Sequence, residues 1–214
     1  MQTSDQDHSR KETWYIAQRW QEFEAESRIC LLRVLMVFLF YAAQLIHYSQ
    51  WGNGDVDRMF HRQATGIAAA WLFVSMGIAI ALNRGFFPSW LKYAATLADL
   101  VLLSVLASLG HGPSSPLVLI YFVVIAITSL RFDLPILWCS VVGSITGYML
   151  LVGKADTSWF DASHATPPIQ QAITVLSMIG CGIALDQVLR SVRRFTREVE
   201  SRTENMKNQG GLHV

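Results

Sequence analysis

The chain has 214 residues, of which 52% are hydrophobic and only 15% charged, and its mean hydropathy is +0.32. Soluble domains carry about 25% charged residues, so this composition argues against an ordinary water-soluble globule. A net charge of +1 gives no reason to expect nucleic-acid binding. The three cysteines, Cys30, Cys139 and Cys181, are too few and too widely spaced for a disulfide scaffold or a Cys-x-x-Cys metal site.

Apolar segments long enough to cross a bilayer recur along the chain. A transmembrane helix needs about 20 mostly apolar residues, and backbone in lipid must satisfy its own hydrogen bonds, which favours helices. Six spans are predicted, the fourth of them short: residues 29–48, 64–82, 91–109, 115–130, 134–152 and 169–189. We therefore expect an all-α, polytopic membrane protein. The alternative, buried helices of a large soluble protein, leaves too little polar chain to cover six such segments.

The basic residues are distributed unevenly between the two sides that six spans define. Fourteen lysines and arginines, Arg33 included, fall on the side of the chain ends, against Arg58, Arg62 and Lys154 on the other. The positive-inside rule then predicts that both termini lie in the cytoplasm, with the chain in the cell (inner) membrane. Arg33, just inside the first span, is expected to snorkel back to the cytoplasmic side.

Two cytoplasmic segments flank the predicted transmembrane domain of residues 29–189. Residues 1–28 predict an amphipathic interfacial helix that starts at a capping box, Ser9 to Glu12. This helix could anchor the chain at the membrane surface or dock a partner protein. Residues 190–214 predict a helical, coiled-coil-like stub with a flexible tail from Asn208, and no catalytic domain is expected to follow.

An apolar seam continues from the sixth span into the C-terminal segment. We define the seam by its apolar residues at alternating spacings of three and four, a pattern that Arg202 and Met206 extend: Leu185, Val188, Val192, Phe195 and Val199. This heptad spacing favours a coiled coil, and hence a homodimer that transmits a signal along the helix. The alternative is an amphipathic tail lying on the lipid headgroups.

Asp99 lies near the middle of the third predicted span. An ionised carboxylate at that depth costs roughly 3 kcal/mol on insertion scales, so it must face the bundle interior, be protonated or have a partner. Thr96 and Ser104 are the nearby groups that could bond it in a purely structural role. Because intramembrane ionisable groups are often functional, Asp99 is the candidate polar site of the membrane domain. By contrast, Asp186 and Arg190 are predicted to form a structural i,i+4 pair.

Small residues in the fifth span allow another helix to approach closely. Gly143 and Gly147 form a GxxxG pattern, and the sixth span also carries small residues around Gly180. We expect the fifth and sixth spans to pack together through this surface, with dimerisation through it as the alternative.

Four histidines fall on the predicted outer face: His47, His61, His111 and His164. Imidazole groups there could sense pH or join nearby aspartates in binding a divalent metal, but the spacing of metal-binding pairs is missing. No nucleotide-binding, hydrolase or metalloprotease signature is found in the sequence. We therefore expect no catalytic residues, no bound metal and no cofactor.

The turn between the third and fourth spans carries the most recognisable pattern. It comprises Asp99 with its apolar neighbours, the hairpin sequence Gly-His-Gly-Pro-Ser-Ser-Pro from Gly110, Tyr121, and Leu-Arg-Phe-Asp from Leu130. This stretch resembles the six-helix membrane input modules of bacterial sensor histidine kinases and adenylate/guanylate cyclases. His111 departs from the usual Gly-Gly pair, and no segment of residues 1–214 is expected to form the output domain of those proteins. The resemblance implies a last helix that feeds a dimeric output domain.

Three functions are compatible with these features. The favoured one is a membrane sensory or anchoring module that dimerises and signals through its last helix to a cytoplasmic output domain or partner, such as a kinase, cyclase or phosphatase. The second is a small transporter or channel that uses Asp99 as an ion or proton site. The third is a membrane enzyme that uses the outer histidines and a metal.

Overall fold

The computed structural model describes residues 25–46, 55–84, 88, 90–110, 112–155 and 167–210, and every regular element in these ranges is helical. The order is a first helix, Ala25–Ile46, then α2 (Asp55–Asn83), α3 (Leu91–Leu109), the 3-10 helices η1 (Gly112–Ser114) and η2 (Pro116–Val118), α4 (Leu119–Ser129), α5 (Leu134–Ala155) and α6 (Pro168–Gly210). The prediction of an all-α protein is confirmed for the described part of the chain. The predicted helix at residues 1–28 lies almost entirely outside the described residues.

Within the described ranges, five helices are long and apolar enough to cross a membrane: Ala25–Ile46, Arg58–Asn83, Leu91–Leu109, Leu134–Ala155 and Pro168–Glu198. They coincide with five of the six predicted spans. The remaining prediction, residues 115–130, forms η2 followed by α4, whose α-helical part has only 11 residues. The helix is short because the preceding hairpin takes up residues that the prediction assigned to the span.

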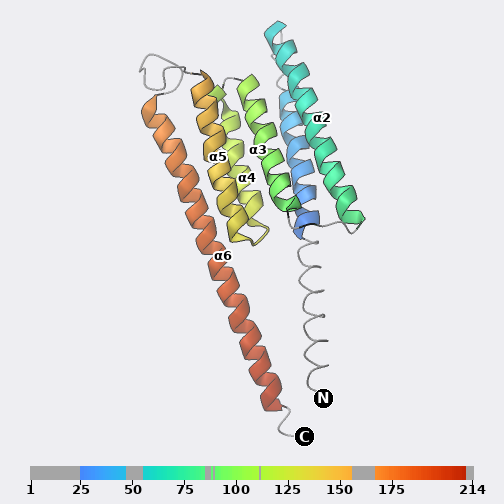
Figure 1. Cartoon of the computed structure of the whole chain (residues 1–214), viewed down its shortest axis with the longest axis vertical. Helices are drawn as coiled ribbons and strands as arrows, with labels where there is room; N and C mark the ends of the chain where they lie inside the picture. The colour runs from blue at the N-terminus through green and yellow to red at the C-terminus, as the bar shows by residue number, and fades with distance from the viewer. Residues whose placement is uncertain are drawn as a thin grey trace.

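The helices lie side by side in one bundle, and α6 continues far beyond it (Figure 1). The interior of the bundle is formed by α3, α4 and α5, while α6 packs on α4 and α5, and α2 packs on α3. α6 has 43 residues, which corresponds to about 65 Å, roughly twice the hydrocarbon thickness of a bilayer. α6 extends beyond the end of the bundle at which the described part of the first helix, drawn in blue, begins (Figure 1).

The surface of the bundle is apolar, unlike that of a soluble protein. Several aromatic and aliphatic side chains are about two-thirds exposed: Phe38, Phe73, Leu150 and Leu176. Meanwhile, Leu103, Tyr121 and Tyr148 are completely buried between helices. Large apolar patches on a single chain mark contact with lipid or with another protein. Together with the five apolar helices, this surface indicates a membrane protein.

A tight hairpin joins α3 to α4, as the sequence predicts. Gly112 has a φ of +62°, a left-handed conformation that glycine adopts without steric cost. Pro113 is buried, and the Ser115 hydroxyl accepts a hydrogen bond from the Leu117 backbone N–H at 3.2 Å, which caps η2.

The GxxxG face of α5 packs on α3 and α4 rather than on α6. A Cβ atom on Gly143 would lie 2.5 Å from Leu100 Cδ1, and one on Gly147 would lie 2.7 Å from Ser104 Oγ and 2.8 Å from Tyr121 Oη. The expected packing of the fifth span on the sixth is confirmed, but the GxxxG pair is not the surface that joins them. α6 does pack on α5, but through Gly182, whose Cβ would lie 2.7 Å from a methyl group of Val141.

We expect Gly147→Val to destabilise the bundle by about 1–3 kcal/mol, because the added atoms meet two hydrogen-bonded hydroxyls with no free space around them. Gly180→Val is the matched control, since nothing lies within 4 Å of a Cβ at that helical position. Thermal unfolding in detergent micelles measures both variants. Equal unfolding temperatures for the two would contradict close packing at Gly147.

Candidate functional site: buried ion pairs beside an apolar cavity

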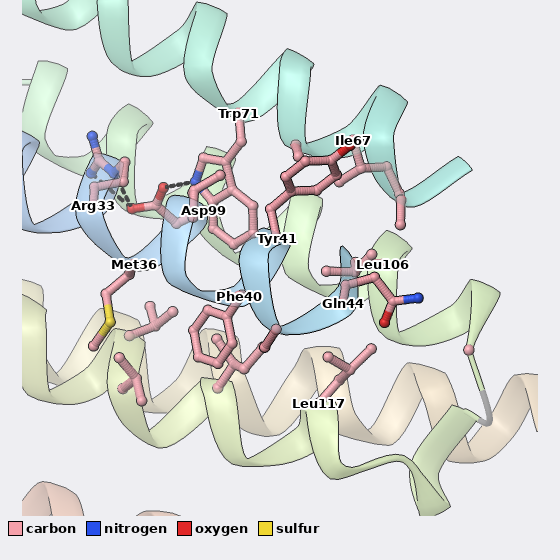
Figure 2. A pocket seen from close by; sticks show the side chains of 18 of the residues that line it. Arg33, Met36, Phe40, Tyr41, Gln44, Ile67, Trp71, Asp99, Leu106 and Leu117 are labelled. Atoms are coloured by element: carbon pink, nitrogen blue, oxygen red, sulfur yellow. Dashed lines mark hydrogen bonds and ion pairs between the residues drawn. The ribbon is translucent and has the colours of Figure 1, made fainter. Parts of the chain in front are cut away.

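Asp99 is buried in the bundle, and both of its carboxylate oxygens accept hydrogen bonds from other helices (Figure 2). Arg33 donates to Oδ2 through Nε at 2.9 Å and Nη2 at 2.8 Å, and Trp71 donates to Oδ1 through Nε1 at 2.8 Å. Asp99 therefore has the partners that its position in the membrane requires, Arg33 on the first helix and Trp71 on α2. Thr96 and Ser104 instead bond the backbone of their own helix.

Arg33 does not snorkel to the membrane surface, contrary to the sequence-based expectation. Its side chain is 5% exposed and lies at the depth of Asp99. The first helix and α3 run in the same direction through the bundle (Figure 1), and the contact between Arg33 and Asp99 joins them within it. Pairing inside the bundle gives Arg33 a charged hydrogen-bond partner there, which removes the reason to reach for water.

A second buried ion pair joins the start of the first helix to the turn after α4. Arg131 bonds Glu26 through Nε to Oε1 at 2.6 Å and through Nη2 to Oε2 at 3.0 Å, and both side chains are less than 10% exposed. Its third nitrogen, Nη1, donates to the Thr96 hydroxyl on α3. A bidentate pair of this kind fixes orientation as well as charge. It ties three segments together at one end of the bundle.

The turn that carries Arg131 also contacts α3 and α6. Lys92 at the start of α3 bonds Asp133 at 2.5 Å, in a pair that is about one-quarter exposed. Arg193 of α6 donates to the carbonyl oxygen of Phe132, a residue held at a φ of 53°. Residues 130–133, which we call the junction turn, therefore connect the first helix, α3 and α6.

A cavity of about 620 Å³ lies between the first helix, α2, α3 and α4. One end is formed by Arg33, Asp99 and Arg131, and the other by the hairpin around Ser115 and Leu117. Between these ends the walls are mostly apolar, and Figure 2 shows the side chains that the first helix contributes beside the ion pair. Its size is typical of small-molecule binding sites.

One of the four predicted outer histidines can be placed. His61 lies on α2 with its ring stacked on Tyr41, at 6.2 Å between centroids, and the Tyr41 hydroxyl bonds Thr65 at 3.2 Å. His47, His111 and His164 lie outside the described residues. Within the described ranges, no three His, Cys, Asp or Glu side chains gather as metal ligands would. A shared role for the four histidines stays a prediction.

The seam on α6 is largely uncovered by the rest of the chain. Val188, Val192 and Phe195 are 56%, 43% and 69% exposed, whereas Leu185 is partly buried against the core. The side chain of Val199 lies outside the described ones. The predicted pair of Asp186 and Arg190 is confirmed, at 2.9 Å.

Sequence reasoning identified Asp99 but missed the residues that surround it. The sequence predicts Arg33 at the membrane surface and predicts no role at the site for Trp71, Glu26 or Arg131. Arg33, Trp71 and Arg131 line the cavity beside Asp99, and Glu26 is paired with Arg131. Comparison with family models, curated proteins and solved structures found no match for this chain. The geometry therefore carries the functional argument.

Proposed function

We propose that this protein is a membrane sensory or anchoring module that dimerises and passes a rearrangement of its helices along α6 to the cytoplasm. The observation that carries the proposal is α6 itself: 43 residues of unbroken helix that begin against α5 and end far outside the bundle (Figure 1). A continuous helix can transmit a shift or rotation over its full length. The exposed seam on α6 offers a surface for a second copy.

The distribution of charge supports the orientation. Arg190, Arg193, Arg194 and Arg197 lie where α6 leaves the bundle, at the end that also holds the junction turn. The positive-inside rule favours the cytoplasm for this end. We accordingly place the protein in the inner membrane with six crossings, in which the short α4 serves as the fourth.

The junction turn supplies the contact through which the bundle could move α6. Phe132 accepts from Arg193 at the point where α6 leaves the bundle, while Arg131 in the same turn holds Glu26 and Thr96. A change in the first helix or α3 would thus reach α6 through neighbouring residues of one turn. Such coupling requires that the turn have two discrete arrangements.

The partner would be a cytoplasmic kinase, cyclase or phosphatase, or an output domain joined to the same helix. This follows from the resemblance of the α3–α4 region to bacterial sensor input modules. The transporter alternative gains no support from the site, because both oxygens of Asp99 are already bonded to Arg33 and Trp71. A transport site would need an oxygen available to the ion.

Single cysteines on the seam test the parallel dimer. With Cys30, Cys139 and Cys181 replaced by serine, we expect Val192→Cys and Phe195→Cys each to crosslink in membranes, since seam residues of paired helices face one another. Dimer bands on a non-reducing gel measure the reaction.

Arg197→Cys is the matched control, because position 197 lies on the opposite face of the heptad from residues 192 and 195 and is exposed. The control should crosslink several-fold less. Equal crosslinking at all three positions would indicate random collision, and no crosslinking at either seam position would refute parallel pairing through α6.

A further inference from the structure

We propose that the cavity beside Asp99 is a binding site for an acyl-chain lipid whose uncharged carbonyl or hydroxyl group lies at the Arg33 end. Binding does not depend on the proposed signalling function. The inference stands on the length of the cavity, its lining, its polar end and the balance of charge around that end.

The cavity is long in the direction of the helices. Its lining runs along the first helix from Ile29 to Gln44, which at 1.5 Å per residue is about 22 Å. The opposite wall runs from Thr128 on α4 back to Leu117 at the hairpin. A space of this length parallel to the helices of a membrane protein has the dimension and direction of an acyl chain.

The walls between the two ends suit a hydrocarbon chain. Figure 2 shows Met36 and Phe40 on the side of the first helix that faces α4, with Leu106 and Leu117 further along. Two polar side chains of the first helix also lie along this stretch, Tyr41, whose hydroxyl bonds Thr65, and Gln44 at the hairpin end. Burying an apolar chain against such side chains is favourable in proportion to the area covered. Dispersion contacts add to this, since an empty cavity leaves its lining without partners.

Hydrogen-bond donors remain available at the polar end. A guanidinium carries five N–H groups, of which Asp99 engages those on Nε and one on Nη2. Arg33 lines the cavity, so its other N–H groups can donate to a carbonyl or hydroxyl oxygen of an occupant. Both oxygens of Asp99 are used, which makes this end a donor to the ligand rather than an acceptor.

The balance of charge selects an uncharged headgroup. Arg33 is paired with Asp99, and Arg131 with Glu26, so the buried charges at this end cancel within the described part of the chain. A carboxylate added here would be a buried charge without a counter-ion, which is strongly unfavourable. An ester, amide or alcohol keeps the hydrogen bond without that cost. Free fatty acid anions should therefore bind more weakly than their esters.

Native mass spectrometry of the full chain in detergent, titrated with methyl oleate, tests the proposal. We expect a one-to-one adduct, and at least tenfold weaker binding of oleate at neutral pH. Ala64→Phe fills the cavity from α2 and should weaken methyl oleate binding at least tenfold. Ala70→Phe is the matched control on an exposed position of α2 outside the lining, and it should bind as the wild type does.

A second filling variant, Ala43→Phe on the first helix, keeps the test decisive if Ala64→Phe fails to fold, because Ala43 lines the cavity but is itself exposed. Absence of an adduct with the wild type, equal binding by filled and control variants, or tighter binding of oleate would overturn the proposal.

Dioleoylglycerol, a bilayer lipid with an uncharged headgroup, serves as a second probe to identify the source of the acyl chain. If this second probe forms an adduct, and Ala43→Phe or Ala64→Phe abolishes it, the site takes a bilayer lipid. If only methyl oleate binds, the site takes a free acyl ester. Both results support the site.

Discussion

Replacing Asp99 with leucine is expected to destabilise the protein by about 3–5 kcal/mol, because the change leaves the buried guanidinium of Arg33 without its counter-ion. Arg33→Leu should cost a similar amount by leaving the carboxylate unpaired. The double variant Arg33→Leu/Asp99→Leu should lose much less than either single change, since it removes both charges and leaves apolar side chains of comparable size. The expected pattern is therefore strongly non-additive.

Unfolding of the purified protein in a single detergent, followed by circular dichroism against denaturant, measures this cycle. Glu198→Leu is the control, since the pair of Glu198 and Arg202 on α6 is more than half exposed and should contribute less than about 0.5 kcal/mol. A double variant as unstable as the sum of its parts would show that Arg33 and Asp99 are not coupled.

Part of this ion pair could be predicted from the sequence, because depth in the membrane can be counted from the predicted start of each span. With spans that start at residues 29 and 91, Arg33 lies four residues into the first span and Asp99 eight residues into the third. The difference of four residues is about 6 Å along a helix, which a long arginine side chain can cover. An acid and a base on two helices that enter from the same side are therefore natural partners.

Other features of the site could not be read from the sequence. Trp71 reaches Asp99 only because α2 packs against α3, and neighbour relations between helices depend on tertiary packing. The GxxxG pattern correctly predicts a close approach to α5, but the pattern does not name the approaching helix. Glu26 and Arg131 are 105 residues apart, and only the fold brings them together.

The helices themselves were well predicted, since each depends on local apolar length or periodicity. Five spans agree with the structure to within a few residues at most ends, while α2 begins earlier than predicted, at Asp55. The unbroken heptad phase predicts a helix that continues past Leu189, and α6 does continue, as far as Gly210. The helix includes residues 208–210, where the sequence predicts a flexible tail. Whether the seam pairs with a second copy stays a prediction.

Arg131→Leu should also cost about 3–5 kcal/mol, because Glu26 is then left buried without its bidentate partner and Thr96 loses its donor. Arg131→Lys should fall between this variant and the wild type, since lysine keeps the charge but cannot make the two parallel bonds. Lys92→Ala removes the other ion pair of the junction turn. That pair is partly exposed, so its loss should cost no more than about 1 kcal/mol.

The same variants separate stability from transmission. If the junction turn carries movement to α6, Arg131→Lys should speed backbone hydrogen exchange at residues 130–133 and around Arg193, whereas Lys92→Ala should affect mainly the start of α3. Deuterium uptake measured by mass spectrometry distinguishes the two patterns. Uptake around Arg193 that does not respond to Arg131→Lys would mean that α6 is held by its packing on α4 and α5 alone. The contact between Arg193 and Phe132 would then play no part in signalling. If that contact transmits movement, weakening the bonds of Arg131 in the same turn must change hydrogen exchange around Arg193.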